Sequence, residues 1–280
     1  MTGSRAAVLG SPIGHSLSPV LHRAAYQRLG LTGRSYDAFD VDEVALPGFL
    51  DRIDAAVWCG LSLTMPLKRA VIPLLAEVSE VALAVEAVNT VLFAEDGTRR
   101  GENTDVPGIV AALAERGITG ADAAAVLGGG ATAASAIAAL ASIVHGGPVH
   151  VYVRTPSRAE QLIQTAERSG IELYVNPWTQ VGESLEAPLV VNTTPKGAAD
   201  ELVESVTKPV GTLFDVLYHP WPTPLAAAWE RAGGVVLGGL DLLIHQAALQ
   251  VELMTGAEST QRPAVVAAMR AAGVAALNER

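Results

Sequence analysis

Val126-Leu127-Gly128-Gly129-Gly130-Ala131-Thr132-Ala133, near the middle of the chain, is the segment from which the architecture can be inferred. An apolar run ends here in three glycines, and an alanine-rich segment that we expect to be helical follows from Thr132 to Leu140. This order predicts the strand–turn–helix of a dinucleotide-binding fold, with the pattern G-x-G-x-x-A. Gly128 allows the tight turn, Gly130 lets the backbone approach a pyrophosphate, and Ala133 is small enough for close helix packing. The N-terminus of the helix directs N–H groups and its positive dipole end at the phosphates.

The next strand indicates which dinucleotide such a fold would bind. Val149-His150-Val151-Tyr152-Val153 ends in Arg154-Thr155-Pro156-Ser157-Arg158. An NAD site usually has Asp or Glu here for the ribose 2′-hydroxyl, whereas a basic residue suits a 2′-phosphate. A glycine run alone also occurs in ordinary loops, but this basic segment favours a cofactor site. We therefore predict NADP as the cofactor, bound by Gly128, Gly129, Gly130, Ala131, Thr132, Arg154, Thr155 and Arg158.

Short apolar strands alternate with helical patterns along the whole chain, which predicts an α/β fold. We expect strands at 6–9, 35–39, 56–63, 90–93, 98–102, 149–153, 171–175, 189–191, 213–217 and 235–237, and a further strand in the apolar run that ends at Leu127. We expect helices at 18–29, 46–53, 67–75, 107–114, 132–140, 240–255 and 262–277. Ser18 is the expected N-cap of the first helix, with Pro19 at its first position. Asp96-Gly97 is the expected turn of a β-hairpin.

The length of 280 residues predicts two domains, and the glycine turn lies in the second of them. Residues 1–104 are expected to form an α/β substrate-binding domain. Residues 105–239 are expected to form a Rossmann-type NADP-binding domain. Residues 240–280 contain no further strand pattern, so we expect these C-terminal helices to pack back on the first domain.

Composition excludes several classes of protein. The formal net charge of −10, without a run of Lys or Arg, speaks against a nucleic-acid surface. The lone Cys59 lies in an apolar run, which excludes a disulfide framework and predicts core packing in a reducing compartment. No signal-peptide or membrane-span pattern is visible, so we expect a cytoplasmic protein. The six histidines lack metal-ligand spacing, and we expect no metal.

Four polar clusters in the first half lie after expected strands or before expected helices, where open α/β sheets bind ligands. They are Gly14-His15-Ser16-Leu17-Ser18-Pro19, Ser62-Leu63-Thr64-Met65-Pro66-Leu67-Lys68, Ala87-Val88-Asn89-Thr90 and Gly101-Glu102-Asn103-Thr104-Asp105. In this order, ahead of the glycine turn, they resemble the shikimate dehydrogenase family. Further matches are Val191-Asn192-Thr193-Thr194-Pro195, Asp215-Val216-Leu217-Tyr218, Thr223-Pro224-Leu225, Gly239-Leu240 and His245-Gln246-Ala247.

The resemblance implies an enzyme that reduces 3-dehydroshikimate to shikimate with NADPH, a step in aromatic amino acid biosynthesis. It implies that Ser16 and Ser18 bind the substrate carboxylate and that Lys68 and Asp105 are the catalytic pair. It places Thr193 and Gly239 beside the cofactor. The implied contacts to the ring hydroxyls are Thr64, Lys68, Asn89, Asp105, Tyr218 and Gln246. A lysine at a helix start is also unfavourable for the helix dipole, so Lys68 needs another reason such as a carboxylate partner.

Three positions depart from the family pattern. Ser62-Leu63-Thr64 stands where the family often has Asn-Val-Thr, and Val153 stands where it often has Asn. Asp241-Leu242 replaces the usual Leu-Met, which puts the packing beside the nicotinamide in question.

Each candidate also has a plain structural interpretation. Ser16, Ser18 and Asp105 could be helix caps, Lys68 a solvated surface residue, and Tyr218 a packing residue.

Two other functions remain open at this stage. A quinate/shikimate or aminoshikimate dehydrogenase shares the same motifs, but NAD-linked members are expected to carry an acid where this chain has Arg154. Ser18, rather than the Thr expected in enzymes that use quinate, also favours shikimate. A non-catalytic NADP-binding regulatory protein would be favoured by loss of Lys68 or Asp105, and both are present. A monomer and a homodimer are equally compatible with the sequence.

Overall fold

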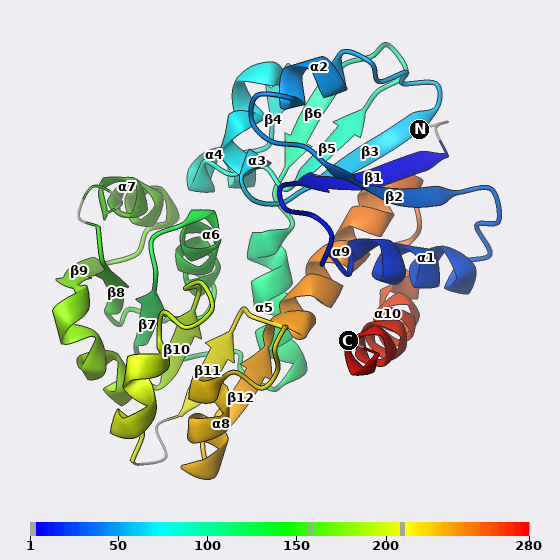
Figure 1. The fold of residues 1–280 in the computed structure, drawn as a ribbon. Helices are drawn as coiled ribbons and strands as arrows, with labels where there is room; N and C mark the ends of the chain where they lie inside the picture. Colours follow the sequence, from blue (N-terminus) through cyan, green and yellow to red (C-terminus); the bar gives the residue numbers. More distant parts are fainter. Residues whose placement is uncertain (1–3, 156, 158, 208–210, 280) are drawn as a thin grey trace. The chain divides into compact units, whose positions relative to one another are not determined.

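The computed structural model describes residues 4–155, 157, 159–207 and 211–279. The chain forms two compact units, each with a six-stranded sheet and its own helices (Figure 1). Unit 1 consists of Met1–Thr104 with Leu243–Arg280, and unit 2 consists of Asp105–Leu242. The α/β fold class is therefore confirmed.

The sheet of unit 1 brings one end of four strands to a common edge. Its order is β2-β1-β3-β5-β6-β4. β1 is parallel to β2 and β3, whereas β5 is antiparallel to both β3 and β6. The ends of β1, β3 and β6 therefore share an edge with the start of β5. The strands are β1 (Arg5–Gly10), β2 (Ser35–Asp40), β3 (Trp58–Leu63), β4 (Glu77–Val78), β5 (Thr90–Phe93) and β6 (Arg99–Glu102).

Helices cover this sheet because successive side chains of a strand point to opposite faces. Ala7 and Leu9 of β1 join a buried core with Leu46 and Leu67 from helices on one face. The first and last helices of unit 1, α1 and α10, pack side by side (Figure 1, blue and red). The helices are α1 (Ser18–Arg28), α2 (Leu46–Leu50), α3 (Leu67–Ala70), η1 (Ile72–Leu74), α4 (Glu80–Val85), η5 (Ser259–Gln261) and α10 (Arg262–Asn278), and α9 (Gly239–Thr255) belongs to this unit from Leu243.

Local details of unit 1 correct the sequence-based expectations. Ser18 is not the N-cap of α1, because Leu17 holds that position and Ser18 is already helical. The hydroxyl of Ser16 instead accepts a hydrogen bond from the Ser18 N–H at 3.2 Å. The helix predicted at 67–75 splits into α3 and η1, since Pro73 cannot continue an α-helix. The helix predicted at 46–53 ends at Leu50, and β4 and α4 were not predicted.

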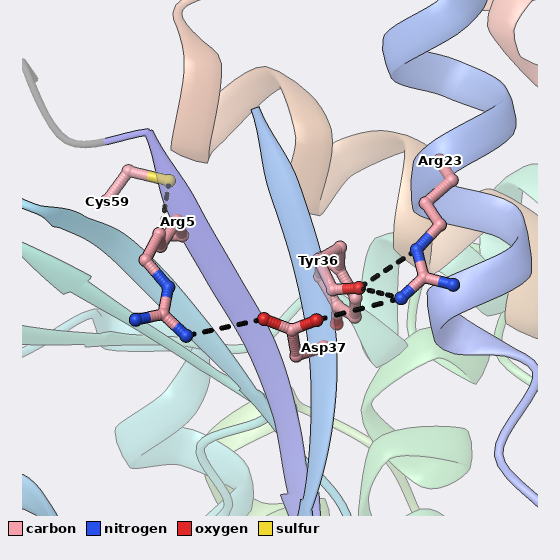
Figure 2. Close-up of polar contacts among 5 residues, drawn as sticks. All are labelled: Arg5, Arg23, Tyr36, Asp37 and Cys59. Carbon is pink, nitrogen blue, oxygen red and sulfur yellow. Dashed lines mark hydrogen bonds and ion pairs between the residues drawn. The ribbon is translucent and has the colours of Figure 1, made fainter. Parts of the chain in front are cut away.

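Charged side chains tie α1 to the outer strand β2 (Figure 2). Arg23 donates from Nε and Nη2 to the Tyr36 carbonyl at 3.1 and 2.7 Å. The Asp37 carboxylate lies between Arg23 and Arg5, 3.7 and 3.4 Å from their Nη2 atoms. Such contacts cover an outer strand, whose exposed polar backbone otherwise invites pairing with another chain. On the side of β1 away from β2, the buried Cys59 thiol of β3 donates to the Arg5 carbonyl at 3.2 Å, which confirms its packing role.

Unit 2 contains a fully parallel sheet of order β12-β11-β10-β7-β8-β9. The chain leaves β7 toward β8 on one side and later returns to β10 on the other, so the carboxyl end of β7 is a topological switch point. The strands are β7 (Ala124–Leu127), β8 (Val149–Val153), β9 (Leu173–Pro177), β10 (Leu189–Asn192), β11 (Thr212–Asp215) and β12 (Val235–Gly238). The helices are α5 (Asp105–Glu115), α6 (Ala131–Leu140), α7 (Ala159–Ser169), η3 (Trp178–Glu186), η4 (Asp200–Ser205) and α8 (Pro224–Arg231).

A buried histidine lies between α1, β2 and α9 in unit 1. The His22 ring stacks on Tyr36 with centroids 3.8 Å apart, and its Nε2 lies 3.3 Å from Gln250 Oε1. Burial lowers the pKa of His22 to about 3. The imidazole is therefore neutral in the folded protein at pH values where an exposed histidine is charged.

We expect His22 to make the folded protein sensitive to mild acid. Below pH 6.5 the unfolded chain binds a proton on His22 that the folded chain refuses until about pH 3, so stability falls as the pH falls through this window. The loss attributable to His22 is about 2 kcal/mol between pH 7 and pH 5. Urea unfolding at several pH values should show a shallower pH slope for His22→Phe, which keeps the stacking but cannot titrate. His145→Phe, at an exposed site, should retain the wild-type slope. An unchanged slope in His22→Phe would contradict the assignment.

Candidate active site

The polar clusters predicted from sequence meet at the common strand edge of unit 1. Thr64 directly follows β3, and its N–H donates to the Leu9 carbonyl of β1 at 2.9 Å. Asn89 directly precedes β5, and its carbonyl accepts from the Leu63 N–H at 2.8 Å. Ser16 and Ser18 follow β1, and Ser18 is buried. These contacts place hydroxyl and amide groups from three neighbouring strands at one edge.

Asn89, Thr104 and Gln246 form a buried hydrogen-bond network at this edge. Asn89 Oδ1 accepts from the Thr104 N–H at 2.9 Å, and Asn89 Nδ2 donates to Thr104 Oγ1 at 2.9 Å. Gln246 Oε1 accepts from Thr104 Oγ1 at 3.4 Å and from Asn89 Nδ2 at 3.5 Å. The structure thus brings together two predicted substrate contacts, Asn89 and Gln246, from segments more than a hundred residues apart.

Gln250 extends this network into the interior, a role that the sequence did not predict. Gln250 Nε2 donates to the Asn89 carbonyl at 3.1 Å and to Thr90 Oγ1 at 2.9 Å. Its Oε1 accepts from Ser62 Oγ at 2.7 Å, and Tyr36 donates to Ser62 Oγ at 2.6 Å. Gln250 follows Gln246 by four residues, so the two lie on the same face of α9. The four-residue spacing of Gln246 and Gln250 is the sequence feature from which the role of Gln250 could have been inferred.

Lys68 lies in α3, between the loop after β3 and the segment before β5. It is half-buried, and its carbonyl accepts from the Val88 N–H at 2.8 Å, next to Asn89. α3 has only four residues, and Lys68 lies in its last turn as well as its first. The helix-dipole argument for a special role of Lys68 is therefore wrong, because one turn has no separate unfavourable end.

The glycine turn of unit 2 has the predicted geometry. Gly128 has a φ of +113°, which favours glycine, and a Cβ there would lie 2.6 Å from Thr193 Oγ1. Thr193 Oγ1 donates to the Leu127 carbonyl at 2.7 Å, so the segment after β10 is tied to the turn after β7. Gly130 is the N-cap of α6, and the space where its Cβ would lie is open. Gly129 completes the turn, and the N–H groups of Ala131 and Thr132 open the helix.

Arg154 lies at the carboxyl end of β8, the strand next to the glycine turn. Its side chain is exposed, and its Nη2 donates to the Ala198 carbonyl at 2.7 Å. The guanidinium carbon lies 4.9 Å from the centroid of the Trp178 ring. Thr155 is exposed beside it, and the predicted Arg158 lies outside the described residues.

The remaining predicted residues of unit 2 lie at helix starts and in one loop. Asp105 is buried and is the first residue of α5. Tyr218 is half-buried in the loop after β11. This loop is closed by Asp215, whose Oδ2 accepts from Thr223 Oγ1 at 2.7 Å. Burial raises the pKa of the Asp215 carboxyl. A Cβ at Gly239 would overlap the Val216 carbonyl oxygen, so the loop requires glycine there.

The unusual Asp241 has a local explanation in unit 2. Its carboxylate is nearly buried and lies 3.5 Å from Arg116 Nη2. Asp241 Oδ2 also accepts from the Gly238 N–H at 3.4 Å, just before α9 begins. The acid therefore stabilises the start of α9.

Two negative findings apply to the residues that the structure describes. Within them, no cluster of three or more His, Cys, Asp or Glu side chains could hold a metal ion. No helix among them is both long and apolar enough to cross a bilayer.

These features define a class of protein. A parallel sheet with a glycine turn at its switch point is the build of a Rossmann-type domain. The other unit adds a strand edge of hydroxyl, amide and lysine side chains, as a polar substrate requires. Together they are the features of a dinucleotide-dependent enzyme that acts on a small polar substrate.

Comparison with known proteins names the family. Residues 8–91 match the shikimate dehydrogenase substrate binding domain. A shikimate dehydrogenase (NADP(+)) from Thermus thermophilus is 40% identical over 96% of this chain and 99% of its own length. The chain belongs to the shikimate dehydrogenase family.

Solved structures agree with this assignment. A shikimate 5-dehydrogenase from Thermus thermophilus, in complex with NADP(H) and shikimate, superposes with a TM-score of 0.81 and 37% identity, over 96% of this chain and 99% of that one. A quinate dehydrogenase from Corynebacterium glutamicum, in complex with NAD, superposes with a TM-score of 0.84 and 28% identity, over 98% and 99% of the two chains.

Asn89 should be important for the stability of unit 1. Asn89→Ala leaves the Thr104 N–H and hydroxyl without their buried acceptor and donor, which should lower the free energy of unfolding by about 1–3 kcal/mol. Urea unfolding at neutral pH measures this loss. Asn176→Ala removes an amide at a partly exposed site of β9 and should change the stability by less than about 0.5 kcal/mol. Equal effects of the two substitutions would argue against the network.

Proposed function

We propose that this chain catalyses the reversible reduction of 3-dehydroshikimate to shikimate by NADPH, in aromatic amino acid biosynthesis. The observation that carries the proposal is the buried network of Asn89, Thr104 and Gln246, which presents amide and hydroxyl groups for a polyhydroxylated ring. Family membership and the similarity to a complex that holds shikimate support the choice of substrate.

The glycine turn of unit 2 fits the cofactor. The backbone of Gly128, Gly129 and Gly130 would approach the pyrophosphate, and the N–H groups of Ala131 and Thr132 would donate to it. Thr193 and Gly239 would line the dinucleotide site, while Arg154, Thr155 and Arg158 would face the adenosine 2′-phosphate. When bound, NADPH supplies the hydride that adds to the substrate carbonyl carbon.

Short polar side chains would hold the substrate. The hydroxyls of Ser16 and Ser18 would donate to the carboxylate. Thr64, Asn89, Tyr218 and Gln246 would bind the ring oxygens. Ser16 Oγ accepts from the Ser18 N–H, which leaves its hydroxyl hydrogen for donation to a carboxylate.

Lys68 and Asp105 would carry the proton transfer. Lys68 Nζ would donate a proton to the substrate carbonyl oxygen as negative charge develops on that oxygen. The Asp105 carboxylate would orient the ammonium group. In the reverse direction the Lys68 amine would accept the proton of the shikimate hydroxyl.

Two finer points are also part of the proposal. We infer a cytoplasmic enzyme, since the biosynthetic relatives and the reduced Cys59 are consistent with that compartment. A monomer or a homodimer is sufficient for the proposed chemistry.

The direct test is a steady-state assay of shikimate and quinate, each with NADP+ and NAD+. We expect shikimate with NADP+ to have the highest kcat/KM of the four combinations. A higher value for quinate with NAD+ would favour a quinate/shikimate dehydrogenase instead, and an aminoshikimate enzyme would prefer the amino analogue. Cofactor binding without turnover would favour an NADP-binding regulatory protein.

Lys68→Ala should reduce kcat by about 10²–10⁴-fold, the usual contribution of a positioned general acid. KM for shikimate should change much less, because the proposed carboxylate contacts are untouched. Asp105→Asn should reduce kcat as well, and the double variant should be little worse than the poorer single one, since the two residues act as a unit. A Lys68→Ala enzyme with normal kcat and a raised KM would make Lys68 a binding residue only.

A further inference from the structure

The strand register of unit 2 places a tryptophan beside the basic segment. β8 and β9 are parallel, and Val153 lies opposite Pro177. Arg154 and Trp178 are the next residues of the two strands, so they leave the carboxyl edge of the sheet at the same level. The pair is not visible in the sequence alone, because its members are 24 positions apart and the pairing register is needed to align them.

Trp178 is fixed by packing and by a hydrogen bond, and the Arg154 guanidinium lies over its ring. The indole packs against the buried core of unit 2, and its Nε1–H donates to the Glu201 carboxylate in η4. The Arg154 guanidinium lies over the ring, 4.9 Å from its centroid, and donates to the Ala198 carbonyl at 2.7 Å. Segments that follow β8, β9 and β10 thus converge on one guanidinium.

We propose that Trp178 is a positioning residue for cofactor choice, which holds the Arg154 guanidinium ready for the 2′-phosphate. This inference rests on the proposed use of NADP. A free arginine side chain at the surface samples many rotamers, and ordering it on binding costs entropy. An arginine already stacked on a fixed ring and hydrogen-bonded at one nitrogen has lost most of that freedom beforehand.

The Arg154 guanidinium has more N–H donors than the Ala198 carbonyl uses, and these donors suit a phosphate. A guanidinium has five N–H donors in one plane, and the Ala198 carbonyl accepts from one of them. The guanidinium carbon lies over the indole ring, and this contact takes up no N–H donor in a conventional hydrogen bond. Paired N–H groups along the edge can bind two oxygens of a phosphate, which a 2′-hydroxyl cannot match.

The test compares two adenosine ligands by isothermal titration calorimetry. Adenosine 2′,5′-bisphosphate carries the 2′-phosphate, and 5′-AMP lacks it. Trp178→Leu should lower the ratio of their affinities about three- to tenfold, the range of a cation–π contact at a partly exposed site. Trp178→Phe keeps an aromatic face and should restore most of the ratio. Arg154→Ala should lower the ratio at least as far as Trp178→Leu.

The matched control is Arg5→Ala. Arg5 makes the same kind of stack on Trp58 in unit 1, with the guanidinium carbon 4.6 Å from the ring centroid. Its loss should leave the affinity ratio unchanged, even where it alters thermal stability. If Trp178→Leu fails to fold by circular dichroism, Trp178→Gln serves the same purpose at this half-buried position.

Clear outcomes would overturn the inference. An unchanged ratio in a folded Trp178 variant without a ring would do so, as would an equal loss of affinity for both ligands. Equal binding of the two ligands by the wild type would remove the role of Arg154 and with it that of Trp178. The enzyme could fail to oxidise shikimate while the affinity ratio still falls as expected in the Trp178 variants. That result would reject the proposed reaction and leave the role of Trp178 intact.

Discussion

A buried amide at the sheet edge, the side chain of Asn89, is the interaction on which unit 1 depends. Its oxygen and nitrogen both contact Thr104, and its nitrogen also reaches Gln246. A buried polar group without a partner is costly, so the start of β5, the end of β6 and helix α9 must keep their relative positions. The proposed substrate side chains are thereby ordered by the same bonds that close the core, before any ligand arrives.

In unit 2 the backbone around the proposed cofactor site fits together because two glycines lack a Cβ atom. Gly128 adopts a backbone conformation that other residues avoid, and its missing Cβ makes room for Thr193. Gly239 makes room in the same way for the loop that carries Tyr218. In unit 1 side-chain hydrogen bonds fix the site, and in unit 2 the absence of side chains at two glycines is needed as well. Substitutions should therefore fail for different reasons: lost partners in the first and overlap in the second.

Features set by local sequence were predictable, and those set by long-range pairing were not. The glycine turn, the succession of strands along the chain apart from β4, and the C-terminal helices follow from periodicity and turn residues. The cap of α1 was wrongly assigned because a serine before a proline resembles a cap, while the actual bond comes from Ser16. Gln250 and Trp178 were missed because their partners lie on other segments. Their roles depend on the packing of α9 and on the β8–β9 register, which one sequence cannot reveal.

The placement of the four tryptophans gives each unit its own optical reporter. Trp58 is the indole of unit 1 and is nearly buried, whereas Trp178, Trp221 and Trp229 belong to unit 2. Trp229 is fully enclosed in the core there, so its emission should shift to the red only when that core opens. Chains that retain a single tryptophan, at position 58 or 229, would therefore reveal by fluorescence whether the two cores melt together or one after the other.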